Sequence, residues 1–160
     1  MQDALMDAWS ARTENLPLTE PYEALILASI VEKETGVASE RPEIAGVFTR
    51  RLALRMRLQT DPTVIYGLGA EFDGNLTRRH LRDDNNQFNT YRIAGLPPTP
   101  IALPGKEAIV ASLNPKDGEA LYFVAKGDGS HAFSRTLSEH EENVRRYQLK
   151  RRKDYRSSPK

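Results

Sequence analysis

Residues 22–36 read YEALILASIVEKETG and contain the most apolar run of this 160-residue chain. Thr19 offers an N-cap before the run, Pro21 suits a first helical turn, and Gly36 offers a C-terminal stop. Residues 24–31 include no charged side chain, so such a helix is apolar on nearly every side. We therefore predict that this helix lies buried at the centre of the domain.

The flanking segments predict further helices and one β-hairpin. Helices are predicted over residues 1–9, 77–81 and 106–113. Another begins with Ser39 and Pro42 and runs to Leu52, and a short one runs from Asp61 to Tyr66 and is stopped by Gly67. A last helix follows a capping box of Ser138 and Glu141. The apolar runs 121–124 and 131–134 flank the turn sequence KGDGS and predict the hairpin. We predict a helix-rich α+β fold with a single domain over residues 21–149, a helix and linker before it (1–20) and a basic tail after it (150–160).

Composition excludes several classes of protein. Hydrophobic residues make up 39% of the chain and charged residues 28%, which is typical of a soluble globular domain. The longest apolar run is far shorter than the ~20 residues of a membrane-spanning helix. Because the chain has no cysteine, it has no disulfide framework, zinc ribbon or thiol nucleophile.

The net charge of +1 is unevenly distributed. Residues 145–160 carry eight basic side chains and one acidic one, so this end has a charge of +7 and the rest of the chain −6. Such a run can bind phosphate or anionic lipid, or it can complement the dipole at a helix end. No aromatic stacking platform or nucleic-acid motif accompanies the charges, so we do not expect a nucleic-acid partner.

Most common catalytic motifs are absent from the sequence. His80, His131 and His140 are not paired at metal-ligand spacing, and the chain has neither a phosphate-binding glycine loop nor a serine nucleophile elbow. We therefore expect no metal and no cofactor.

The unusual feature is a pair of glutamates, Glu32 and Glu34, at the end of the apolar helix. At ~100° per residue, Glu34 projects towards Leu27, Ile30 and Val31, and Glu32 towards Leu25, Ala28 and Ser29. Apolar surroundings raise the pKa of a carboxyl group and suit it to act as a general acid, which favours Glu34. The alternative is that both glutamates only solvate the helix end.

Several ordered motifs resemble those of the YceG-like (MltG) family of endolytic murein transglycosylases. They are ASIVEKET (28–35), VASER (37–41), MRLQTDPTVIYG (56–67), NTY (89–91), GLPP (95–98), YFVA (122–125) and GSHAF (129–133). The resemblance extends over roughly residues 20–148. It implies non-hydrolytic cleavage of the β-1,4 bond between N-acetylmuramic acid (MurNAc) and N-acetylglucosamine in peptidoglycan, leaving a 1,6-anhydro-MurNAc end. It also implies that Glu34, followed by the small hydroxyl residue Thr35, is the catalytic residue, with Glu32 as the fallback.

A transglycosylase needs one carboxyl group where most glycosidases need two, because the nucleophile is the muramyl O6 of the substrate itself. The protein must then orient the sugar. The expected substrate-binding residues are the polar side chains of the motifs: Gln59, Thr60, Asp61, Asn89 and Tyr91. Asp61 has the alternative role of capping a helix, and Tyr91 that of anchoring its loop.

The resemblance also implies a cellular setting. The expected partners are peptidoglycan glycan strands and peptidoglycan synthases, in the periplasm, with the parent protein held in the bacterial inner membrane by an N-terminal anchor outside this sequence. Two rival functions stay open: a hydrolytic muramidase in which a carboxylate such as that of Asp61 activates water, and a non-catalytic glycan-binding module.

Overall fold

A computed structural model describes residues 1–148 of the chain. Its elements are α1 (Gln2–Ser10), α2 (Pro21–Glu34), the 3-10 helix η1 (Ala38–Glu40), α3 (Arg41–Ala53), α4 (Asp61–Leu68), the 3-10 helix η2 (Gly69–Glu71), α5 (Arg78–Leu81), α6 (Lys106–Leu113), β1 (Tyr122–Ala125), β2 (His131–Ser134) and α7 (Leu137–Tyr147). The two strands form one antiparallel sheet in which Tyr122 pairs with Ser134 and Ala125 with His131. The predicted helix-rich α+β fold is confirmed.

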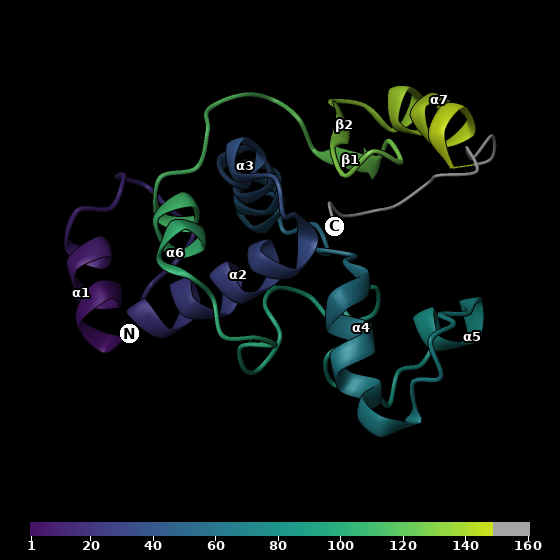
Figure 1. Cartoon of the computed structure of the whole chain (residues 1–160), viewed down its shortest axis with the longest axis horizontal. Helices are drawn as coiled ribbons and strands as arrows, with labels where there is room; N and C mark the ends of the chain where they lie inside the picture. The colour runs from purple at the N-terminus through teal and green to yellow at the C-terminus, as the bar shows by residue number, and fades with distance from the viewer. Residues whose placement is uncertain (149–160) are drawn as a thin grey trace.

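Helix α2 is the centre of the core, as its composition predicts. Leu27, Ile30 and Val31 have no exposed surface, and α2 packs against α1, α3 and α6. Figure 1 shows α2, α3 and α6 in the middle of the molecule with α1 beside them. Each fully buried leucine, isoleucine or valine side chain contributes about 1.5–3 kcal/mol to folding. The apolar run therefore fixes the position of the helix whose last turn carries Glu34.

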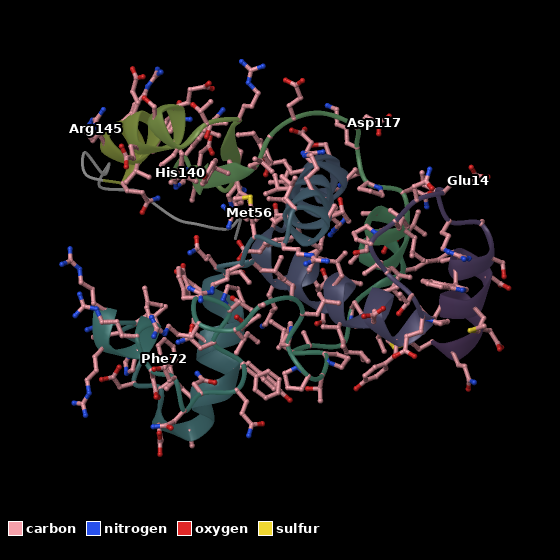
Figure 2. The ribbon with its side chains drawn as sticks, turned by 180° about the vertical axis from the view of Figure 1, so that it is seen from behind. Glu14, Met56, Phe72, Asp117, His140 and Arg145 are labelled. Atoms are coloured by element: carbon pink, nitrogen blue, oxygen red, sulfur yellow. The ribbon has the colours of Figure 1, made fainter. Side chains whose placement is uncertain are left out.

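Two smaller units extend from this core (Figure 1). One is the hairpin with α7, and it is joined to the core by an edge-to-face contact of Phe123 with Phe48, whose ring centroids lie 5.6 Å apart. Figure 2 shows His140 of α7 directed towards the hairpin, where its ring stacks on Tyr122 at 5.0 Å. The other unit consists of α4 and α5, which follow the end of α3. Glu34 lies where α2 meets this second unit.

Several predicted helix starts are wrong by one or two residues, because a neighbouring residue takes the N-cap position. Glu20 is the N-cap of α2, while the Thr19 hydroxyl and amide both donate to the Glu23 carboxylate. Thr136, rather than Ser138, caps α7, and its hydroxyl accepts from the Glu139 amide. The predicted start of the second helix at Ser39 belongs to η1, and α3 begins at Arg41.

Two predicted helix ends also differ from the structure. Helix α2 ends at Glu34, because Thr35 already has extended backbone angles (φ −145°, ψ 141°). Helix α4 continues through Gly67 to Leu68 and ends at Gly69, whose positive φ of 57° is a conformation that glycine adopts without strain.

Residues 1–20 pack into the same core as the rest of the chain. Leu5 and Leu18 are buried within it, and Trp9 packs against it. The Thr13 amide also donates to the Leu113 carbonyl at the end of α6. The predicted basic tail, residues 150–160, lies outside the described residues. Within residues 1–148, no helix is long and apolar enough to cross a membrane.

Candidate active site

Glu34 is the last residue of α2, and its carboxyl group faces the start of α4. The hydroxyl of Thr60, the N-cap residue of α4, donates a hydrogen bond to Glu34 Oε1. Glu34 keeps partial exposure, whereas Thr60 is buried. The end of one helix and the beginning of another thus hold one carboxyl group on a residue that is partly exposed.

A cluster of buried threonines fixes Thr60 in place. The Thr60 amide donates to Thr90 Oγ1 at 2.9 Å, and Thr63 Oγ1 donates to the Thr60 carbonyl at 2.8 Å. The hydroxyls of Thr63 and Thr90 lie 2.8 Å apart. Sequence reasoning expected Thr60 at the site and did not single out Thr63, because a threonine inside a short helix carries no signal of its own. The cluster makes Thr60 a rigid donor to Glu34.

Asp61 and Tyr91 form a second pair beside Glu34. The Tyr91 hydroxyl donates to Asp61 Oδ1 at 2.6 Å. Asp61 is the first residue of α4 and makes no side-chain cap, so the expectation that it caps the helix is wrong. Burial, followed by the charge of Asp61, raises the pKa of Tyr91, so the phenol stays protonated and remains the donor. This hydrogen bond also anchors the 83–91 loop to α4, which is part of the alternative role expected for Tyr91.

The carboxyl of Glu34 titrates near neutrality. Burial raises the pKa of this carboxyl group from 4.5 to about 7. The hydrogen bond from Thr60 lowers the pKa, and the nearby charge of Asp61 raises it further. At neutral pH such a carboxyl group exists in both protonation states. It can therefore donate a proton and take one back.

Glu32 has a different environment from Glu34, as the helical geometry predicts. Its Oε1 accepts the Gly105 amide at 2.7 Å, and Gly105 is the N-cap residue of α6. A carboxylate at a helix N-terminus satisfies an otherwise unpaired amide and interacts favourably with the helix dipole. Glu32 thus joins α2 to α6, and its fallback assignment as the catalytic residue has no support in this contact.

Asn89 is corrected from an expected substrate ligand to a residue that shapes the loop. Its side chain has no exposed surface. The amide nitrogen donates to the carbonyls of His80, Leu81 and Asp83 at 3.0–3.2 Å, and the amide oxygen accepts the Tyr91 amide at 3.0 Å. No hydrogen-bonding group of Asn89 is left for a sugar.

Gln59 is exposed beside the site and has a positive φ of 52°. Its amide donates to the Thr90 carbonyl at 3.2 Å. The structure therefore brings Glu34, Thr60, Asp61 and Tyr91 together, with Gln59 at the edge. Across residues 1–148, no three His, Asp or Glu side chains lie close enough to hold a metal ion.

Thr35, directly after Glu34, is held by a buried pair that sequence reasoning missed. The Glu40 carboxylate accepts the His131 amide at 2.8 Å, lies 3.0 Å from His131 Nδ1, and is 3.4 Å from the Thr35 hydroxyl. Glu40 was not singled out as a site residue, because an acid beside a helix start is ordinarily exposed. The hairpin is thereby tied to the end of α2.

Comparisons with known proteins place this chain among related sequences. A family model described as the YceG-like family matches residues 1–146, which extends the resemblance to the N-terminus of the chain. The chain is 40% identical over 126 residues to an endolytic murein transglycosylase of Bacillus subtilis (79% of this chain, 34% of that protein). It is 33% identical over 137 residues to an endolytic murein transglycosylase of Streptococcus pneumoniae (83% of this chain, 24% of that protein).

A solved structure supports the same relationship. The crystal structure of a YceG-like protein from Listeria monocytogenes superposes with a TM-score of 0.71 and 39% identity, covering 88% of this chain and 42% of that one. The chain spans about a third or less of the length of these curated relatives. Because the family model matches nearly all of the described residues, this chain belongs to the YceG-like family.

Proposed function

We propose that this chain is the catalytic part of an endolytic peptidoglycan lytic transglycosylase that uses Glu34 as its acid and base. The single observation that carries the proposal is the carboxyl group of Glu34, a partly exposed residue at the end of α2, which accepts the Thr60 hydroxyl and whose pKa burial raises to about 7. The name of the relatives, endolytic murein transglycosylase, supports the substrate class.

The reaction needs two proton transfers at one carboxyl group. Protonated Glu34 donates to the glycosidic oxygen between MurNAc and N-acetylglucosamine as the bond from MurNAc C1 breaks. The O6 hydroxyl of the same MurNAc then bonds to C1 and gives its proton to the Glu34 carboxylate. The products are a 1,6-anhydro-MurNAc end and a free 4-hydroxyl on N-acetylglucosamine. Glu34 is protonated again, and neither water nor a cofactor is consumed.

The neighbouring residues have distinct roles in this proposal. Thr60 orients the Glu34 carboxyl by donating to one of its oxygens. Asp61, held by Tyr91, places negative charge beside the positive charge that develops at C1. Gln59 is exposed and offers an amide to the sugar hydroxyl or acetamido groups. Asn89 contributes indirectly by fixing the backbone of Tyr91.

One observation favours a rival reaction. The charge of Asp61 lies close enough to Glu34 to raise its pKa, so the site contains a second carboxylate that could activate water. A muramidase of this kind would leave a reducing MurNAc end. The identity of the new end therefore separates the two enzymes, and a non-catalytic glycan-binding module would release no fragments.

The test is mass spectrometry of muropeptides after incubation of the chain with purified sacculi. We expect 1,6-anhydro-MurNAc products with the wild type, none with Glu34→Gln, and near wild-type yield with the matched control Glu32→Gln. Circular dichroism should show folded protein in all three. Reducing ends would establish the muramidase, and full activity of Glu34→Gln would place the acid elsewhere.

We also propose that the parent protein works in the periplasm, anchored in the inner membrane, on strands supplied by peptidoglycan synthases. A reaction on nascent glycan needs an enzyme close to the site of synthesis. Fractionation of cells that make the tagged parent, followed by crosslinking, should recover it in the membrane fraction with a synthase. Recovery in the cytosol would contradict this placement.

A further inference from the structure

A cavity that Glu34 does not line lies between the end of α4 and α5. Its volume is about 690 Å³, and it is lined by Leu68, Glu71, Arg79, His80, Arg82, Asp83 and Asn85. Phe72, labelled in Figure 2, marks the segment that joins η2 to α5 in this unit. None of the residues assigned to the reaction lines the cavity, so the proposed chemistry does not account for it.

The lining carries both signs of charge. Arg79 and Arg82 supply guanidinium groups, Glu71 and Asp83 supply carboxylates, and Asn85 adds an exposed amide. Guanidinium groups bind carboxylates, and carboxylates bind ammonium groups, so this lining matches a ligand that carries both carboxylate and ammonium groups. A neutral sugar provides neither group, whereas a short peptide of mixed charge provides both.

The cavity and Glu34 are joined by two rigid connections. Helix α4 begins at Asp61 and ends at Leu68, and eight residues at about 1.5 Å each span roughly 12 Å. The second connection is Asn89, whose amide nitrogen binds three carbonyls of the cavity rim (residues 80–83) and whose amide oxygen binds the Tyr91 amide. The cavity therefore keeps a fixed distance from the site of cleavage.

This distance suits the substrate of the proposed reaction. Each MurNAc carries, through its lactyl group, a stem peptide with several carboxylates and, at its third residue in many bacteria, an amino group. Three extended residues reach about 10 Å, close to the span of α4. We propose that the cavity binds the stem peptide of the muramyl residue being cleaved, an inference that rests on the function proposed above.

The test compares two kinds of soluble, uncrosslinked glycan strand, with and without stem peptides, for binding to the inactive Glu34→Gln protein. Removing the peptide with an amidase leaves a free lactyl carboxylate on each MurNAc, so both kinds of strand remain anionic. We expect peptide-bearing strands to bind at least about tenfold more tightly. Arg79→Ala/Arg82→Ala in the same background should abolish that preference and leave binding of peptide-free strands unchanged.

Arg78→Ala is the matched control, because Arg78 is an exposed arginine of the same helix that does not line the cavity. It should keep the preference. Equal binding of the two strand types, or an equal loss for both in the double variant, would overturn the proposal. Muropeptide release by the otherwise wild-type chain, measured in parallel, keeps the two proposals apart. Peptide-dependent binding without cleavage would refute only the transglycosylase, and cleavage without peptide dependence would refute only the peptide site.

Discussion

Replacing Glu34 with glutamine should make the protein more stable at pH 8 and should have a much smaller effect at pH 5. In the folded chain the pKa of Glu34 is raised from 4.5 to about 7, so between these values the native state holds a proton that the unfolded chain releases. The stability of the wild type therefore falls as the pH rises through this window, and the loss is complete above the folded pKa. Glutamine cannot titrate, so it removes this loss.

The magnitude follows from the two pKa values. At about 1.4 kcal/mol per pKa unit, a rise from 4.5 to about 7 corresponds to at most about 3 kcal/mol. The partial exposure of Glu34 reduces this figure. For a chain of this length, 3 kcal/mol corresponds to a Tm difference of roughly 6–12 °C.

The assay is urea denaturation of wild type and Glu34→Gln at pH 5, 6, 7 and 8. Glu32→Gln is the control: it weakens the contact with the Gly105 amide, so it should destabilise the protein and should not become stabilising at pH 8. A constant difference between wild type and Glu34→Gln across the pH range would refute the argument, because Glu34 would then have the same pKa in both states. The proposed mechanism could then no longer rely on a raised pKa to keep Glu34 protonated near neutral pH.

Three further variants test the contacts around Glu34. Tyr91→Phe removes the hydrogen bond to Asp61 and should lower kcat for strand cleavage at least about tenfold, with a Tm within about 3 °C of the wild type; an unchanged kcat would remove Tyr91 from the site. Asn89→Ala leaves three carbonyls and the Tyr91 amide without their partner and should destabilise the fold by about 3 kcal/mol in urea denaturation, so a Tm equal to that of the wild type would contradict its buried role. Thr60→Val removes the bond that lowers the pKa of Glu34, so the alkaline limb of the pH–rate profile should move to higher pH; a shift to lower pH would refute the donor role of Thr60.

The sequence predicted those features that depend on neighbours along the chain. The apolar run identified α2, the residue spacing on that helix separated Glu34 from Glu32, and glycines and prolines marked the hairpin and most helices. Helix ends were less accurate, because caps such as Thr136 compete with adjacent residues of similar chemistry.

The remaining features depend on contacts between distant residues. The bond between Thr60 and Glu34 joins positions 26 apart, and that between His131 and Glu40 joins positions 91 apart. No local pattern encodes such pairs. Asn89 was misassigned for a related reason: an amide serves equally well to bind a sugar or to hold loop carbonyls, and only its burial distinguishes the two roles.

The link between Glu40 and His131 has a consequence for the timing of activity. During synthesis, α2 emerges long before the hairpin, and until residue 131 is made, the Glu40 carboxylate beside Thr35 lacks both of its His131 contacts. The support of Thr35 is therefore completed only after the hairpin is made, although Thr35 itself is translated well before the hairpin. A chain cut before the hairpin, which on the proposed function would otherwise endanger the cell wall, holds Thr35, the residue next to the proposed acid, without this support.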